Sequence, residues 1–181
     1  MSLRTLRLEP ATAESLAPFG RLVGPDDSRP ARLGKFYGDK VQLWSPGEFT
    51  SDSDTVLSVA RVHPRPRQVM WMERHFKHTQ TFIPLRGSPF IMVLGAPTPT
   101  HQPDPETVRA FAFDGSSGCM LHVGTWHEFP FAAAAQAEFV VILRSETQAN
   151  LEVRDNDEAV GDDLEKRNLA LRLGFGFEVA Q

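Results

Sequence analysis

Short runs of apolar and β-branched residues, separated by turn-forming residues, dominate the middle of the chain. Such runs occupy residues 55–62, 89–94 and 138–143, and residues 108–113 alternate as a strand would. This pattern is typical of strands in a β-sandwich or a β-barrel. We therefore expect an all-β fold, although the local pattern by itself does not choose between a sandwich and a barrel.

The two ends of the chain show other patterns. Residues 1–10 alternate and predict a strand, as does the short run at residues 35–37. Residues 162–173 begin with acids, carry bases toward their end and precede Gly174, which predicts a helix. Residues 175–179 then alternate as a strand would. We expect this helix and strand, within residues 160–181, to cover the barrel or to pair with another subunit.

Composition narrows the class of protein. A chain of 181 residues fits one domain with a sizeable core, so we expect residues 1–181 to form a single unit. The net charge of −4 does not suggest a nucleic-acid partner. The single cysteine, Cys119, allows no internal disulfide and lies among apolar residues, so we interpret it as a small buried hydrophobe in a reducing compartment. No apolar run has the length of a membrane helix, and residues 1–10 contain no apolar signal core, so we expect a cytoplasmic protein without a membrane partner.

The candidate chemistry lies in two stretches. In residues 73–87, Glu73 and His75 are two apart, so on a strand they share a face, and Gln80 follows on the next strand. A carboxylate, an imidazole and a carboxamide can therefore converge on one pocket. In residues 115–127, the second stretch, two histidines stand on either side of a glycine turn; they are His122 and His127.

Both stretches resemble motifs of the cupin superfamily. The first carries the motif spacing at Glu73, His75, Gln80 and Gly87, and the second at Gly115, His122, Gly124 and His127. More narrowly, Glu-Arg-His, Thr-Gln, Phe-Ile-Pro and Gly-Thr-Trp-His, in this order, resemble the ureidoglycolate lyases of allantoin breakdown. The resemblance covers roughly residues 55–145. It implies a cupin-type antiparallel jelly-roll barrel over that region, with a few short peripheral helices.

A metal site is one of two interpretations of the cluster. Glu73, His75, Gln80 and His127 could bind a divalent metal, because imidazoles and carboxylates are ligands and an amide oxygen is a weaker one. However, Glu73 stands where the cupin motif usually has histidine, and Gln80 stands where it usually has glutamate. The other interpretation is a polar pocket without metal, in which these groups hydrogen-bond to each other. The lyase resemblance implies a divalent metal such as nickel.

Two further histidines have less defined roles. His122 could be a fifth metal ligand or an acid–base group, or it could be a turn residue in the wall of the site. We expect His78 to lie at the tip of a turn, in contact with solvent.

Substrate-binding candidates are cations and aromatic residues. Arginine binds a carboxylate in bidentate geometry, and Arg61 and Arg74 fit the lyase-like pattern. Arg74 alternates away from Glu73 and His75, so Arg61 is the stronger candidate. Tyr37 and Trp126 could line the pocket beside Gln80, although packing in the core is the more common role of an aromatic residue.

The resemblance implies cleavage of ureidoglycolate to glyoxylate and urea, a carbon–nitrogen lyase reaction of the amidine-lyase type. Glu73 and His127 are the acid–base candidates, together with His122. The alternatives are another cupin enzyme, such as a metal-dependent dioxygenase or isomerase, and a non-catalytic protein that binds a small acid. The apolar alternation of the last segment and the resemblance also lead us to expect a homodimer.

Overall fold

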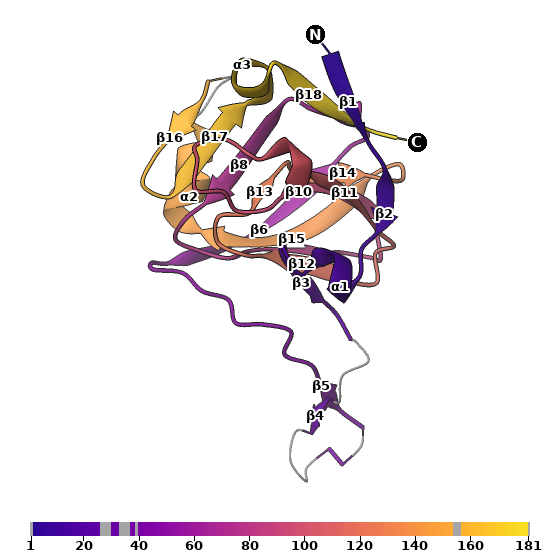
Figure 1. The fold of residues 1–181 in the computed structure, drawn as a ribbon. Helices are drawn as coiled ribbons and strands as arrows, with labels where there is room; N and C mark the ends of the chain where they lie inside the picture. The colour runs from indigo at the N-terminus through magenta and orange to yellow at the C-terminus, as the bar shows by residue number, and fades with distance from the viewer. Residues whose placement is uncertain (1, 26–29, 33–36, 39, 154–156, 181) are drawn as a thin grey trace.

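The computed structural model of the chain describes residues 2–25, 30–32, 37–38, 40–153 and 157–180 (Figure 1). Two β-sheets enclose the main hydrophobic core, and a third, smaller sheet joins the two ends of the chain. The expected strand at residues 35–37 lies almost entirely outside the described residues. None of the helices in the described ranges is long and apolar enough to span a membrane.

One wall of the barrel is a five-stranded antiparallel sheet. In spatial order it contains β3 (Gly20–Val23), β12 (Gly118–Leu121), β9 (Gln80–Pro84), β15 (Ala137–Arg144) and β6 (Thr55–Val62). The edge strand β6 shows why the sequence forms a strand here. Its residues alternate, so that Val56 and Ala60 pack against the core whereas Leu57 and Val59 face solvent.

The facing wall is an eight-stranded sheet in which all pairs are antiparallel except β2–β11. Its order is β16 (Ala159–Val160), β17 (Leu164–Asn168), β8 (Trp71–His75), β13 (Trp126–His127), β10 (Phe90–Gly95), β11 (Arg109–Phe113) and β2 (Leu8–Pro10), with β14 (Phe131–Ala132) also paired to β10. Phenylalanine rings fill the space between the walls; they are Phe82, Phe90, Phe111 and Phe139. The predicted all-β, jelly-roll type of fold is confirmed.

The remaining elements lie around this barrel. β1 (Ser2–Leu6) runs parallel to β18 (Phe175–Val179), which also pairs with β7 (Gln68–Val69). The short hairpin of β4 (Ala31–Arg32) and β5 (Gln42–Leu43) projects away from the barrel (Figure 1). The helices are short, as expected: α1 (Ala13–Leu16), η1 (Pro105–Thr107), α2 (Ser145–Glu152) and α3 (Leu169–Leu173).

The C-terminal helix is shorter than the sequence pattern predicts. Leu164–Asn168 form β17, which pairs with β8, and only Leu169–Leu173 are helical. The Asn168 side chain accepts a hydrogen bond from the backbone N–H of Leu171 and so caps the helix at this point. Pairing with the exposed edge of β8 therefore overrides the helical charge pattern, while Gly174 ends the helix as expected, in the left-handed conformation.

Two motif glycines bring the two chemistry-bearing stretches together. Gly87 and Gly115 both have positive φ angles, of 65° and 93°. A Cβ atom at position 115 would lie only 2.2 Å from the carbonyl oxygen of Gly87. The backbones of the two turns approach this closely because Gly115 has no side chain; a Cβ at position 87 would meet nothing within 4 Å.

Candidate active site

Three adjacent strands place a row of polar side chains on one face of the eight-stranded sheet. Glu73 on β8 is paired in register with His127 on β13 and with Lys166 on β17. Residues directly opposite each other on neighbouring strands point to the same face. Oε1 of Glu73 lies 3.6 Å from Nε2 of His127, and Oε2 of Glu73 lies 3.8 Å from Nζ of Lys166. The row therefore alternates base, carboxylate and cation.

His75 continues this row along β8, because it is two residues beyond Glu73. Its Nε2 lies 3.9 Å from Oε1 of Glu73, and its ring centroid lies 5.2 Å from that of His127. Gln80 reaches the same region from β9 on the opposite wall. Its side-chain oxygen is buried without a hydrogen-bond partner among the described residues, so it can accept a hydrogen bond from a bound molecule. The sequence-predicted convergence of Glu73, His75, Gln80 and His127 is thus present.

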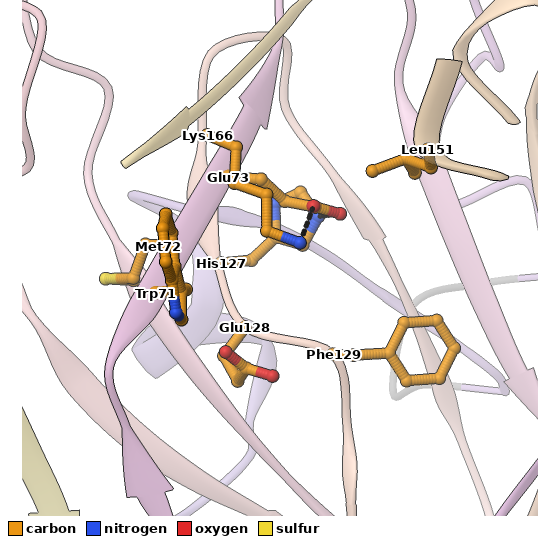
Figure 2. A pocket seen from close by; sticks show the side chains of 8 residues that line it. All are labelled: Trp71, Met72, Glu73, His127, Glu128, Phe129, Leu151 and Lys166. Carbon is orange, nitrogen blue, oxygen red and sulfur yellow. Dashed lines mark ion pairs between the residues drawn. The ribbon is translucent and has the colours of Figure 1, made fainter. Parts of the chain in front are cut away.

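A cavity of about 320 Å³ opens beside the row (Figure 2). In Figure 2 the Glu73 and Lys166 side chains face each other on one side of the cavity, with Glu128 and Phe129 on another side and Leu151 across from them. A smaller cavity of about 190 Å³ shares three of these lining residues and is mostly apolar; it adds Ser58, Ala60, Gln80, Val141, Leu143 and Gln148. Glu73 therefore stands between a charged and an apolar half of one pocket.

His127 has a defined tautomer. Its Nδ1 lies 3.0 Å from the carbonyl oxygen of Thr125, which can only accept a hydrogen bond, so Nδ1 carries a proton. In the neutral ring, Nε2 is then unprotonated, and it has no hydrogen-bond partner among the described residues. The second nitrogen is therefore available as a proton acceptor or a metal ligand.

The electrostatic environment favours a charged Glu73 and a neutral His75. Burial by itself would raise the pKa of Glu73, but His127, His75 and Lys166 outweigh this effect and lower that pKa to about 2. Burial and the nearby His127 lower the pKa of His75 to about 3. At neutral pH the site therefore contains a carboxylate and an uncharged imidazole.

The pKa of Glu128 is shifted upward, in the opposite direction to that of Glu73. Burial raises its pKa to about 7, although the guanidinium of Arg65, 3.0 Å away, works against this rise. Near neutral pH a substantial fraction of the Glu128 side chains is therefore protonated and can donate a proton into the pocket.

The residues around Glu73 fit a divalent metal. Glu73, His75 and His127 each offer a ligand atom, and these atoms all lie within 4.8 Å of one another. The ring nitrogens His75 Nε2 and His127 Nε2 and the oxygen of Gln80 lack hydrogen-bond partners within the described ranges. This donor set of two imidazoles, a carboxylate and an amide oxygen is suited to a first-row transition metal.

Neither of the predicted arginines joins the pocket. Arg61 is on β6 but on the face opposite to Ser58 and Ala60, and its side chain is 60% exposed and paired with Glu138 at 2.6 Å. Arg74 is buried on the far face of β8, where it donates hydrogen bonds to Glu165 and to backbone carbonyls of residues 98 and 100. The cation that lines the cavity is instead Lys166, and Arg65 contacts the cavity residue Glu128 from outside this lining.

Three other expected site residues also lie elsewhere. Trp126 is in the core on the opposite face from His127, and its ring nitrogen donates to Thr98. Tyr37 is 56% exposed and belongs to the projecting segment between β4 and β5. His122 lines a separate cavity near α1, where its Nε2 lies 3.3 Å from the carbonyl oxygen of Ala17.

Sequence reasoning missed Lys166, Glu128 and a buried pair, His78 and Asp163. The expectation that His78 contacts solvent is wrong, since the residue is only 1% exposed and its Nδ1 lies 3.2 Å from Asp163 Oδ2. His78 is three residues after His75, which does not fit the period of two of a strand, so the spacing gave no signal that His78 is buried. Lys166 and Asp163 had no signal either, because residues 162–173 have a helical pattern.

Comparison with known proteins identifies relatives for most of the chain. The family model described as Ureidoglycolate lyase matches residues 3–161. Ureidoglycolate lyases from Pseudomonas syringae pv. tomato and Azotobacter vinelandii are each 32% identical to this chain, over 79% of it and over 85% and 87% of their own lengths. A dTDP sugar isomerase from Desulfovibrio desulfuricans G20 is a distant structural neighbour, with a TM-score of 0.37 and 16% identity over 76% of this chain and 88% of that one. The chain belongs to the ureidoglycolate lyase family.

Proposed function

We propose that this chain is a ureidoglycolate lyase, which splits ureidoglycolate into glyoxylate and urea. The observation that carries the proposal is the row of Lys166, Glu73 and His127 beside a cavity, in a chain of the ureidoglycolate lyase family. The reaction is an elimination of the amidine-lyase type. The hydroxyl group loses its proton and becomes the carbonyl of glyoxylate, and the carbon–nitrogen bond breaks as the departing nitrogen gains a proton.

His127 is the proposed base. Its Nδ1–H bond to Thr125 leaves Nε2 as the proton acceptor, and this atom faces the Glu73 carboxylate. When Nε2 takes the hydroxyl proton, the ring becomes positively charged. Glu73, charged at neutral pH, would stabilise this imidazolium across the 3.6 Å separation.

Glu128 is the proposed acid. It lines the same cavity and, with its pKa raised to about 7, holds a proton that it can release to the departing urea nitrogen. Arg65 beside it would stabilise the carboxylate that remains. Two titratable groups whose pKa values are shifted in opposite directions, here Glu73 and Glu128, are a common arrangement at acid–base sites.

Lys166 and Gln80 are the proposed substrate-orienting residues. The Lys166 side chain is 28% exposed at the cavity wall, where its ammonium group can pair with the substrate carboxylate. The unpaired oxygen of Gln80 can accept a hydrogen bond from a ureido N–H group. A divalent metal, nickel or another ion, held by Glu73, His75 and His127 would act as a Lewis acid on the hydroxyl and carboxylate oxygens. In that alternative Nε2 of His127 is a metal ligand, so the base role of His127 belongs to the metal-free pocket.

The biological setting is proposed on the same basis. Membership of this family supports a place in allantoin and purine breakdown, in the cytoplasm. We also propose a homodimer, supported by the exposed apolar residues Leu57 and Val59 on the edge strand β6. Light scattering that gives a monomer mass at micromolar concentration would contradict this assembly.

A product assay tests the reaction itself. Purified protein is incubated with ureidoglycolate, and urea, ammonia and glyoxylate are measured separately in a preparation shown to be free of urease. We expect urea and glyoxylate in equal amounts, without direct release of ammonia. Ammonia formed at the same rate as glyoxylate would instead indicate hydrolysis of the ureido group.

A further inference from the structure

A second group of ligand-type side chains lies behind the pocket. His75, His78 and Asp163 are all buried, and their ligand atoms lie within 4.8 Å of one another. Oδ2 of Asp163 is 3.2 Å from Nδ1 of His78 and 4.0 Å from Nδ1 of His75. The group contains neither Glu73 nor His127, and its carboxylate comes from the segment just before β17.

The imidazoles of this group lack hydrogen-bond partners. Among the described residues, neither ring nitrogen of His75 or His78 forms a hydrogen bond of good geometry, although the two residues are only 3% and 1% exposed. A buried polar atom without a hydrogen-bond partner destabilises the folded state. Nδ1 of His75 and Nδ1 of His78 both face the Asp163 carboxylate, and an ion bound there would satisfy one nitrogen of each ring.

Asp163 is held in place as a metal-binding carboxylate would be. Its Oδ1 accepts hydrogen bonds from the backbone N–H groups of Phe76 and Lys77, at 3.1 and 2.8 Å. The hydroxyl of Thr147 donates to Oδ2. The second lone pair of Oδ2 remains free on the side of the two imidazoles. Such outer contacts fix the orientation of metal ligands.

We infer that His75, His78 and Asp163 form a second binding site, for a divalent transition-metal ion of the zinc, cobalt or nickel class. Bonds of about 2.0–2.1 Å in tetrahedral geometry place neighbouring ligand atoms roughly 3.3 Å apart. The 3.2 Å separation of His78 Nδ1 and Asp163 Oδ2 matches this value, and the 4.0 Å separation of His75 Nδ1 and Asp163 Oδ2 exceeds it by about 0.7 Å. Two imidazoles and one carboxylate are a ligand set that these ions accept.

The site is separate from the pocket but shares His75 with it. Nδ1 of His75 faces Asp163, whereas Nε2 faces Glu73. An ion on Nδ1 leaves the proton of the neutral ring on Nε2, directed at the Glu73 carboxylate. While this ion is bound, His75 is therefore a hydrogen-bond donor to Glu73 and not a ligand of a metal in the pocket. The buried ion would also fix the orientation of the His75 ring from the side of Asp163. Binding of this ion does not depend on the proposed reaction.

The test measures metal binding in a background that lacks the pocket ligands. The double variant Glu73→Gln/His127→Gln removes two of the three residues of the pocket group and leaves the buried group intact. Full-length protein without a polyhistidine tag is stripped with a chelator and titrated with Co²⁺, whose visible absorption reports tetrahedral coordination. We expect one equivalent of Co²⁺ per chain, displaced by Zn²⁺.

Further substitutions in this background locate the ion. His78→Gln and Asp163→Asn should abolish the absorption band, whereas His63→Gln, at an exposed histidine outside both groups, should leave it unchanged. Thr147→Val removes only a supporting hydrogen bond, and we expect Co²⁺ binding to weaken by about 10–100-fold. This variant keeps the test valid if either ligand variant does not fold, as judged by circular dichroism. Absence of binding in the double variant, or equal binding after His78→Gln or Thr147→Val, would overturn the inference.

Discussion

Nε2 of His127 lies 3.6 Å from Oε1 of Glu73, and the two residues are direct register partners on β13 and β8. Their separation is therefore determined by the pairing of two strands inside a sheet and does not depend on the conformation of a loop. Active sites built on regular elements hold their geometry more tightly than sites built on loops.

Replacing Glu73 by Gln should lower kcat by about 10²–10³-fold, because the positive charge that forms on His127 loses its carboxylate partner. Steady-state kinetics with ureidoglycolate measures this loss, and circular dichroism checks the fold. The matched control is Glu138→Gln, which removes a carboxylate that pairs with Arg61 outside the pocket. Equal kcat values for the two variants would exclude Glu73 from the mechanism.

Replacing Lys166 by Met should raise KM for ureidoglycolate by about 10–100-fold, since a hydrogen bond to a charged group contributes about 1.5–3 kcal/mol. The change in kcat should be smaller, because the ion pair to the carboxylate exists before the reaction starts. Arg61→Met is the control, and it also tests which of the two cations binds the substrate. Arg61 is paired with Glu138 on the outer face, so KM of this variant should stay within about twofold of the wild-type value. A higher KM only in Arg61→Met would reverse the assignment.

The pH dependence of kcat/KM tests Glu128 as the acid, because this ratio reports the pKa values of the free enzyme. Since the protonated form donates, kcat/KM should fall as pH rises through about 7, by about tenfold per unit above that value. Glu128→Gln cannot donate a proton, so its kcat/KM should be lower at pH 6 by about 10²-fold and should lose this decline. A profile that keeps the same decline in Glu128→Gln would assign the acid to another group.

Two glycine substitutions separate backbone strain from steric conflict. Gly115 and Gly174 both have positive φ angles, so alanine should cost about 1–2 kcal/mol of unfolding free energy at either position. Only at Gly115 would the new Cβ also meet backbone, 2.2 Å from the Gly87 carbonyl oxygen, whereas nothing lies within 4 Å at Gly174. Urea unfolding should show that Gly115→Ala is the less stable variant by at least about 1 kcal/mol. Equal stabilities would mean that the two turns can separate without cost.

The strands and the central cluster could be predicted because both depend on local patterns. Alternation placed Glu73 and His75 on one face, and it correctly directed Arg74 away from that face. Apolar runs identified β6, β10 and β15: β10 is buried along its whole length, β15 is buried at most of its positions, and β6 alternates between exposed and partly buried residues. These inferences need only the neighbouring residues.

The errors concern residues whose environment is set by distant parts of the chain. Lys166 lies in a segment with the charge pattern of a helix, yet it forms a strand because β8 offers an unpaired edge. Arg61 fits a carboxylate-binding role by type, but the pairing of β6 with β15 places it beside Glu138. His78 looked like a turn residue, and Asp163, 85 positions later, covers it. Sequence spacing alone contains no record of these contacts.

The position of β17 and β18 has a consequence for how the protein is made. Lys166 reaches the pocket from β17, which covers the edge of β8, and β18 is the partner of β1. During synthesis the N-terminal part of the chain leaves the ribosome first, so β1 and β8 each have an unpaired edge until β17 and β18 have emerged. Unpaired strand edges favour association with other chains. We therefore expect nascent chains that stall before residue 164 to lack the pocket and to be the aggregation-prone species during synthesis.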